Sequence, residues 1–233
     1  MPRLRIACWN CADGLVRKRA LLRRIDADLI VVCEVRRADF AALAPGYAAS
    51  FYSPTATARG IATFCHAPIL TQQRYQPPDS AECYQRLRLG PIDILAAWVK
   101  PRGSYTAPAH RTIAHFLRSI PRSDPALHRI VLGDLNLNPG FDRVKATGRA
   151  TALVAMLARR GLRSLYHQHS GEAFGAEQRA THYFLRSADR PFHIDFIFAS
   201  VGLTLHRFDL GDPADWIGAA KGDHVPLIAE LDY

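Results

Sequence analysis

Short apolar runs that end on a carboxylate constrain the fold of this chain more than any other feature of its sequence. Residues 29–33 (Leu-Ile-Val-Val-Cys) lead directly into Glu34, and residues 130–132 (Ile-Val-Leu) lead through Gly133 to Asp134. Such runs are typical of buried β-strands. A charged side chain at the end of a buried strand costs free energy unless a partner meets it. The pattern therefore predicts strands whose ends bring polar groups together.

Further segments carry the same kind of group. Asn10 follows a strand-like alternating pattern, and Asp195 lies inside an apolar run, where it needs a partner. Asp223 and His224, which precede a late apolar run, supply one. Several such groups in one chain indicate a metal ion and a catalytic cleft rather than an ordinary core.

The order of the expected elements favours an α/β (α+β) fold. Many strand-like segments alternate with a few helices and show no regular strand–helix–strand rhythm, which predicts two packed, mostly antiparallel sheets with helices outside. The chain has 233 residues, 48% of them hydrophobic, so we expect a single domain over residues 1–233. The expected strands cover residues 4–10, 28–35, 47–52, 60–65, 69–75, 83–89, 92–100, 129–132, 192–199, 204–210 and 225–231, and the expected helices cover residues 15–25, 37–43, 109–120 and 151–160.

The charge of the chain points to anionic partners. The formal net charge is +9. A basic surface attracts nucleic acids, phosphorylated metabolites and anionic lipid heads, and the charge alone does not choose among them.

The cysteines and the termini predict a cytoplasmic location. The five cysteines are an odd number and mostly lie inside apolar runs, which fits a reducing compartment. Cys8 and Cys11 have thioredoxin-like spacing, but alternation turns Cys8 inward, so we interpret it as structural. The N-terminal residues enter a strand pattern at once, and no apolar run is long enough to span a bilayer.

Glu34 and Asn10 are candidate metal ligands. Adjacent strands that end side by side would present both side chains to one ion, and magnesium prefers hard oxygen ligands. The alternative is that Glu34 pairs with Arg36 or Arg37 at the surface.

Asp134 and Asn136 are candidates for handling water. They lie two residues apart after a buried strand, so alternation points them to the same side. An aspartate can accept a proton from water, and an asparagine can orient that water or hold a phosphoryl oxygen. The alternative is an Asx-turn that ends the strand.

Asp195 and His224 form a candidate catalytic pair. A carboxylate that is hydrogen-bonded to one imidazole nitrogen fixes the tautomer and raises the basicity of the ring. The ring can then contact a phosphoryl group. The alternative is a buried structural pair.

Taken together and in this order, the segments resemble the endonuclease/exonuclease/phosphatase superfamily, whose fold is that of deoxyribonuclease I and exonuclease III. The matching features are an Asn after the first strand, a Glu after the second, Gly-Asp-x-Asn past mid-chain, Ile-Asp-aromatic-Ile, and a final Asp-His-x-Pro. The resemblance runs from Trp9 to His224. It implies a four-layer α/β sandwich and a metal-dependent phosphoesterase.

The resemblance also implies a role for each position. Glu34 would be the main ligand of Mg²⁺ or Mn²⁺, supported by Asn10, and Asp223 would help to bind the metal. Asp134 and Asn136 would position or activate the attacking water.

By the same resemblance, Asp195 would orient His224, and His224 would contact the phosphoryl group during in-line attack of water on phosphorus. The sequence departs from the family where many members carry a His or Tyr, because Trp98 stands there. An indole N–H is only a donor, so either Tyr105 or His110 would replace the missing group, or metal-bound water would protonate the leaving group instead.

Four residues are candidate substrate contacts: Trp98, Tyr105, Thr181 and Trp216. Thr181 precedes an aromatic segment, and Trp216 lies in an expected loop, where it can stack on a base or pack in the core.

We therefore expect a phosphodiesterase or nuclease that acts as a monomer on a phosphate ester, with DNA or RNA as candidate substrates. The alternatives are a phosphomonoesterase for a small or lipid-derived phosphate, and a decayed enzyme that only binds nucleic acid.

Overall fold

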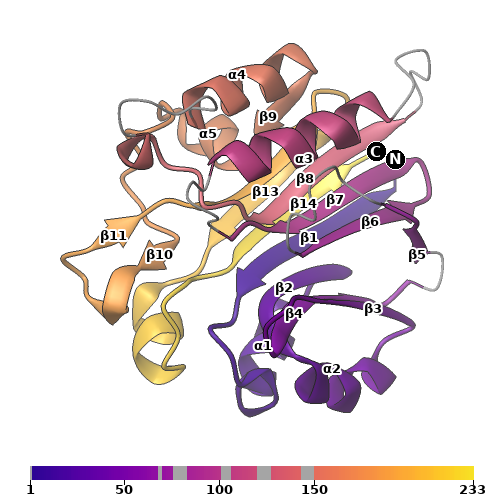
Figure 1. Ribbon diagram of the computed structural model, residues 1–233, viewed down its shortest axis with the longest axis vertical. Helices are drawn as coiled ribbons and strands as arrows, with labels where there is room; N and C mark the ends of the chain where they lie inside the picture. The colour runs from indigo at the N-terminus through magenta and orange to yellow at the C-terminus, as the bar shows by residue number, and fades with distance from the viewer. Residues whose placement is uncertain (1, 68–69, 76–82, 101–105, 120–126, 143–149) are drawn as a thin grey trace.

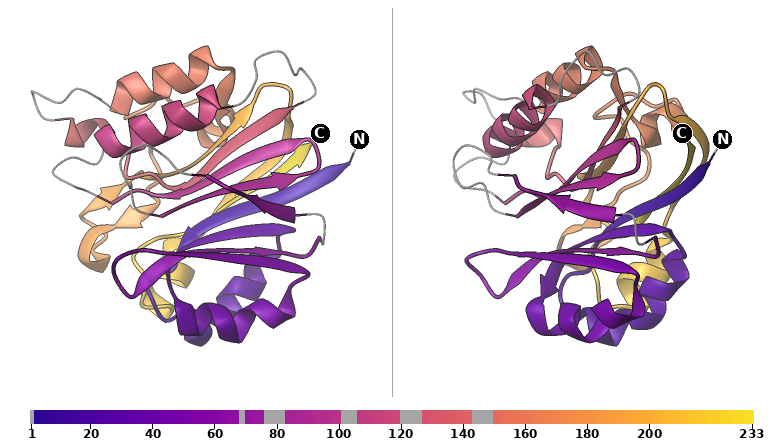
Figure 2. Two further views of the ribbon diagram at one scale, coloured as in Figure 1. Left: turned by 45° about the vertical axis from the view of Figure 1, so that its right-hand side comes forward. Right: turned by 90° about the vertical axis from the view of Figure 1, so that its right-hand side faces the viewer.

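The protein is described from a computed structural model that defines residues 2–67, 70–75, 83–100, 106–119, 127–142 and 150–233. Two six-stranded sheets pack face to face, and helices cover their outer faces (Figure 1). The side views show the same four layers (Figure 2). The predicted four-layer sandwich of mostly antiparallel mixed sheets is confirmed.

The first sheet has the strand order β13–β14–β1–β2–β4–β3. Strands β1 and β2 are parallel, and every other neighbouring pair is antiparallel. The bounds of these strands are β1 Arg3–Asn10, β2 Leu29–Arg36, β3 Ala49–Pro54, β4 Arg59–Cys65, β13 Thr204–Leu210 and β14 Leu227–Asp232.

The second sheet has the order β5–β6–β7–β8–β12–β9 and also contains one parallel pair, β7 with β8. Its other pairs are antiparallel. The bounds are β5 Leu70–Gln73, β6 Tyr84–Leu89, β7 Ile92–Trp98, β8 His128–Asp134, β9 Leu162–Ser164 and β12 Asp195–Ser200. Each sheet therefore has a parallel pair near its middle.

Helices complete the outer layers (Figures 1 and 2). On the side of the first sheet lie α1, which follows a short 3₁₀ turn, and α2, whereas α3 and α4 cover the second sheet and α5 follows β9. None of the described helices has the length and apolar character needed to cross a membrane. The helix bounds are α1 Arg19–Ile25, α2 Arg37–Leu43, α3 Thr106–Arg118, α4 Ala150–Arg159 and α5 Leu165–Ser170, and the 3₁₀ turn is Leu15–Lys18.

Strand β7 shows how the sequence builds two cores at once. All seven of its residues are buried. Ile94 packs in the cluster between the sheets, whereas Leu95 packs in the cluster with Phe116 and Leu153 from the helices. Because successive strand residues point to opposite faces, a continuous apolar run fits a strand that is covered on both sides.

The C-terminal half contains short elements that the sequence did not indicate. The expected strand 192–199 is two elements, because Pro191–Phe192 (β11) pairs with His182–Tyr183 (β10) in a separate arm and β12 begins only at Asp195. Two-residue strands are too short to produce a periodic pattern. The expected loop that holds Trp216 is a helical turn, Ala214–Ala219.

Candidate functional site

The site lies where the two parallel strand pairs end. Asn10 is the last residue of β1, Glu34 lies near the end of β2, Trp98 ends β7 and Asp134 ends β8. A pocket of about 560 Å³ opens beside these ends. The predicted site residues that line it are Glu34, Trp98, Asp134, Asn136, Asp223 and His224. Side chains from distant parts of the chain thus converge as the sequence predicted.

A bulge in β2 aims Glu34 into the pocket. The pairing of β2 with β4 shifts register between Cys33 and Val35, and Glu34 itself has a left-handed φ of 63°. Bulges bend a strand and redirect a side chain, and a non-glycine residue in this conformation is strained. The carboxylate is held on both sides, because Asn10 Nδ2 donates to Oε1 (3.2 Å) and Arg59 donates to Oε2.

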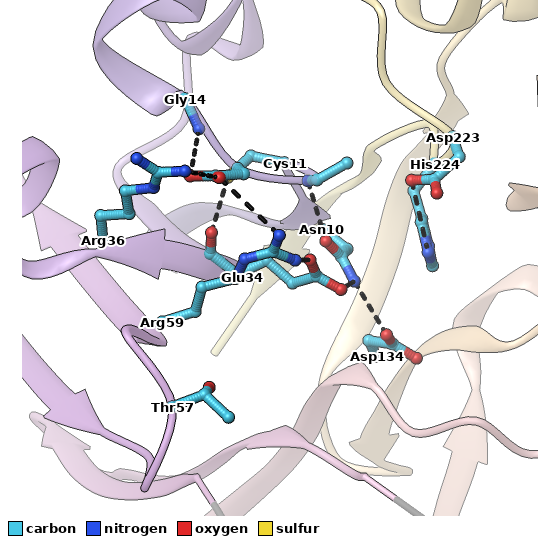
Figure 3. A network of polar contacts seen from close by, with 12 residues as sticks. Asn10, Cys11, Gly14, Glu34, Arg36, Thr57, Arg59, Asp134, Asp223 and His224 are labelled. Carbon is cyan, nitrogen blue, oxygen red and sulfur yellow. Dashed lines mark hydrogen bonds and ion pairs between the residues drawn. The ribbon is translucent and has the colours of Figure 1, made fainter.

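Asn10 connects the carboxylates of the two sheets (Figure 3). Besides Glu34, its Nδ2 donates to Asp134 Oδ2 at 3.0 Å, while its Oδ1 accepts from the backbone N–H of Ala12 at 3.0 Å. The amide nitrogen, not the oxygen, therefore faces the carboxylates. The arginine that pairs with Glu34 is Arg59 rather than Arg36 or Arg37, because Arg36 pairs with Asp13 and the guanidinium of Arg37 lies over the Tyr52 ring.

Asp134 reaches its position through a residue that must be glycine. A Cβ on Gly133 would lie 2.0 Å from the Ala97 carbonyl oxygen of the neighbouring strand, and the φ of Gly133 is 129°. The side chain of Asp134 is buried opposite Asp195 in the β8–β12 pair. Burial and the neighbouring charge of Asp195 raise the pKa of Asp134 to about 8.

Asn136 lies beside Asp134, although not through simple strand alternation. Its φ of 49° ends the extended backbone, and its N–H donates to Asp134 Oδ1 at 3.2 Å, which is the Asx-turn contact. Its Nδ2 donates to the Val99 carbonyl at 2.8 Å. The turn therefore does not exclude a place in the pocket: it holds the Asn136 side chain there.

Asp195 and His224 form the expected pair. The distance from His224 Nδ1 to Asp195 Oδ2 is 2.8 Å, and Trp9 Nε1 donates to the His224 carbonyl at 3.2 Å. Burial alone would lower the pKa of His224, but the charge of Asp195 and the hydrogen bond between Asp195 and the His224 ring raise it to about 9. Asp195 thereby favours the protonated form of the ring.

Thr181 is buried and does not line the pocket. Its hydroxyl accepts hydrogen bonds from the N–H groups of Ile194 and Asp195, both at 3.0 Å, and its carbonyl accepts from the Val225 N–H at 2.9 Å. It thereby fixes the start of β12 to the segment that carries His224.

The three other expected substrate contacts have different positions. Trp98 lines the pocket, and Lys100 Nζ lies 3.9 Å from the centroid of its ring. Trp216 is buried and packs edge-on against Trp9, with ring centroids 5.0 Å apart, so it takes the core-packing alternative. Tyr105 lies outside the described residues. His110, on α3, is not among the described residues that line the pocket.

His182 is a pocket residue to which the sequence gave no role. Its ring centroid lies 4.4 Å from that of His224, and its buried Nδ1 has no hydrogen-bond partner among the described residues. Burial, and then the charge of His224, lower the pKa of His182 to about 4, which favours the neutral ring. The only signal in the sequence was its place between Thr181 and the aromatic pair that follows.

The donor set fits a divalent cation. Asp134 and Asp195 are adjacent buried carboxylates, and carboxylate oxygens are the ligands that Mg²⁺ prefers. Glu34 is connected to this group because the Asn10 side chain donates hydrogen bonds to both Glu34 and Asp134. Among the described residues, two sets of three groups bring their ligand atoms within 4.8 Å of one another: Asp134, Asp195 and His224, and His182, Asp223 and His224.

Known structures share this fold. An AP endonuclease from Archaeoglobus fulgidus superposes with a TM-score of 0.73 and 19% identity, over 99% of this chain and 100% of that chain. A 3' phosphatase from Neisseria, bound to a product DNA hairpin, gives a TM-score of 0.74 and 16% identity, over 99% and 100%. The catalytic domain of human Nocturnin gives 0.66 and 18%, over 99% and 93%.

No curated protein sequence matches the chain. A family model, described as the Endonuclease/Exonuclease/phosphatase family, matches residues 8–224. That match begins in β1, ends at His224 and includes every residue found to line the pocket. The chain therefore belongs to the endonuclease/exonuclease/phosphatase family.

Proposed function

We propose that this protein is a divalent-metal-dependent phosphodiesterase of the nuclease type, which hydrolyses a P–O bond by in-line attack of water. The observation that carries the proposal is the buried hydrogen bond between Asp195 and His224, which favours a positive charge on a ring that faces a pocket also containing Asp134 and Glu34. A fixed positive charge beside carboxylates suits a reaction in which negative charge develops on phosphoryl oxygens.

Glu34 is the residue we assign to metal binding first, because its carboxylate lines the pocket and is partly exposed. Asn10 supports it through the hydrogen bond between their side chains. Asp223, which also lines the pocket, is a further candidate metal ligand. A bound Mg²⁺ or Mn²⁺ would supply Lewis-acid stabilisation of the phosphoryl oxygens.

His224 binds the phosphoryl group in this proposal. Asp195 occupies Nδ1, so Nε2 is the nitrogen left to donate to a phosphoryl oxygen. Asp195 keeps the ring oriented and charged, and Thr181 fixes Asp195 through the backbone. Asp195 and Thr181 are thus positioning residues.

Asp134 accepts the proton of the attacking water, and Asn136 orients that water. A raised pKa makes Asp134 a stronger base than an ordinary carboxylate once it is ionised. Asn136 is held beside it by the contacts to Val99 and to Asp134 itself.

A substrate panel tests the proposal. Purified protein is assayed on bis(p-nitrophenyl) phosphate, p-nitrophenyl phosphate and plasmid DNA, with Mg²⁺, with Mn²⁺ and with EDTA. We expect metal-dependent diester cleavage, and we expect His224→Ala to lower kcat by at least about 100-fold. The matched control is His206→Ala, because His206 lies on β13 and pairs with Asp232.

Wild-type turnover in His224→Ala would refute the assignment of the site. Cleavage of the monoester alone would favour a phosphomonoesterase instead, a candidate because one structure of the same fold is a 3' phosphatase. DNA binding without any hydrolysis would indicate a decayed enzyme.

A further inference from the structure

A second cavity adjoins the catalytic pocket and is strongly basic. Its volume is about 790 Å³, and Arg186 lines both cavities. We call this second cavity the basic cleft. Its charged lining residues are the cations Arg17, Lys18, Arg59, Arg186 and Lys221 and one carboxylate, Asp13.

The carboxylate in the basic cleft does not neutralise these cations. Asp13 is paired with Arg36, which does not line the cleft, and of the cleft cations it forms an ion pair with Arg59 alone within the described part of the chain, at 3.7 Å. Arg17, Arg186 and Lys221 are exposed, and none of the three has an ion-pair partner within the described part of the chain. Unpaired cations around a concave surface attract an anion such as a phosphate.

The residue shared by the two cavities follows an exposed apolar tip. Phe184 is 46% exposed and Leu185 is 71% exposed, and both line the rim of the catalytic pocket. Leu185 and Arg186 have consecutive left-handed φ angles of 56° and 59°. Strained backbone of this kind persists where the surrounding structure fixes it, and it is concentrated at ligand-binding sites.

The arm that carries the tip is attached directly to the catalytic segment. The Tyr183 N–H donates to the Asp223 carbonyl at 2.7 Å, and the Phe184 N–H donates to the Arg190 carbonyl at 3.0 Å. The tip therefore has a defined place between the catalytic pocket and the basic cleft, although its side chains are open to solvent.

From this arrangement we infer that the protein acts on a nucleic-acid strand: the scissile phosphate occupies the catalytic pocket, the adjoining base packs on Phe184 and Leu185, and the next phosphate lies in the basic cleft. The inference rests on the proposed function and names its substrate class. An inorganic or lipid polyphosphate would use the cations but would have no flat group for the tip, whereas every base can stack on an aromatic ring.

The experiment compares two diesters that differ in length. The values of kcat/KM are measured for bis(p-nitrophenyl) phosphate, which has one phosphate, and for a fluorescent single-stranded oligonucleotide. The variants are Lys221→Glu in the basic cleft and Phe184→Ala at the tip. The charge-matched control is Arg163→Glu, because Arg163 is exposed on β9 and lines neither the catalytic pocket nor the basic cleft.

We expect the ratio of oligonucleotide to small-diester kcat/KM to fall about tenfold in Lys221→Glu, which reverses a charge near the strand, and at least about fivefold in Phe184→Ala, which removes the ring on which a base stacks. The Lys221→Glu variant should also show a shallower salt dependence of oligonucleotide binding, by about 0.7 in the log–log slope per phosphate contact that is lost. Arg163→Glu should keep the wild-type ratio.

Two failures are distinguishable. If Lys221→Glu and Arg163→Glu change the ratio equally, or if Phe184→Ala leaves it at the wild-type value, the strand-binding inference is overturned while diester hydrolysis stands. If the wild-type protein cleaves neither ester at any metal concentration, the proposed function itself is overturned.

Discussion

The two parallel strand pairs have the same place in their sheets but different chemistry at their ends. The pair β1–β2 ends in Asn10 and Glu34, and the Glu34 side chain is 21% exposed and paired with Arg59. The pair β7–β8 ends in Trp98 and Asp134, and Asp134 is only 3% exposed. One pair thus ends in a carboxylate that forms an ion pair with an arginine, whereas the other ends in a buried carboxylate that is hydrogen-bonded to the side chain of Asn10 and to the N–H of Asn136.

This difference shows how two similarly placed strand pairs produce a site with different chemistry on its two sides. On the side of β1–β2, solvent and Arg59 compensate the carboxylate, so a cation can replace the arginine. On the side of β7–β8, burial beside Asp195 favours a proton on Asp134. In the proposed function, the first side holds the metal and the second accepts a proton from water.

The largest expected effect is on the buried side. Asp134→Asn removes the proposed proton acceptor, so kcat on a diester should fall by about 10²–10⁴-fold. The melting temperature should not fall, because the substitution also removes a buried carboxylate. Steady-state kinetics and thermal melts measure the two quantities. Unchanged kcat would show that the water is activated elsewhere, and Asp189→Asn is the exposed control.

Gly133→Ala probes the backbone of the same side. The added Cβ would overlap the Ala97 carbonyl at 2.0 Å in a backbone conformation that favours glycine, so we expect a loss of ~3 kcal/mol or more in the free energy of unfolding. Gly90→Ala, in the β6–β7 turn, also has a positive φ but has no atom within 4 Å of its Cβ. It should lose ~1 kcal/mol. Urea titrations that give equal losses would contradict the close approach.

On the exposed side, two substitutions should change metal affinity in opposite directions. Glu34→Gln should raise the Mg²⁺ concentration for half-maximal activity by about 10–100-fold, because it removes a charged ligand. Arg59→Gln should lower that concentration, because Arg59 is the ion-pair partner with which the metal competes. A metal titration of each variant tests this. A shift in the same direction for both variants would contradict the idea that Arg59 and the metal compete for Glu34.

The smallest expected effect is the pH dependence of stability in EDTA. Folding raises the pKa of Asp134 from 3.8 to about 8 and that of His224 from 6.5 to about 9. At these two groups the folded state binds more protons than the unfolded state, so their contribution to stability decreases as pH rises from about 4 to 9. Groups whose pKa folding lowers, such as His182, contribute in the opposite direction below about pH 6.5. The melting temperature should therefore fall between about pH 6.5 and 9, and the fall below pH 8 should be smaller in Asp134→Asn than in the wild type. A wild-type melting temperature that rises over that range would contradict both raised pKa values.

The sequence predicted which residues meet at the site better than it predicted their orientation and their partners. Glu34 and Asp134 were found because each follows an apolar run, and that signal is local. The bulge that turns Glu34, and its pairing with Arg59, depend on β4 and leave no trace in β2 itself. Trp216 was a candidate substrate contact because its segment has the sequence of a surface turn. In the structure its ring packs edge-on against Trp9, a contact that the local sequence does not reveal.

The arm residues were harder to interpret. His182 and Thr181 lie in a two-residue strand and its approach, so no periodicity marks them, and their neighbours His224 and Asp195 are distant in sequence. Trp98 was expected at the site because it stands where many members of the family carry a His or Tyr, and it lines the pocket.

The hydroxyl of Thr181 has a consequence for how such an enzyme can be altered. The hydroxyl accepts from the N–H of Asp195, while the backbone N–H of Thr181 donates to the Phe192 carbonyl of the β10–β11 arm at 3.0 Å, so a displacement at one is transmitted to the other. In the proposed function, substrate selectivity and turnover are therefore linked through this residue. Exchanging the arm to accept a different ester would preserve chemical rate only if the graft begins beyond Tyr183 and leaves that anchor in place.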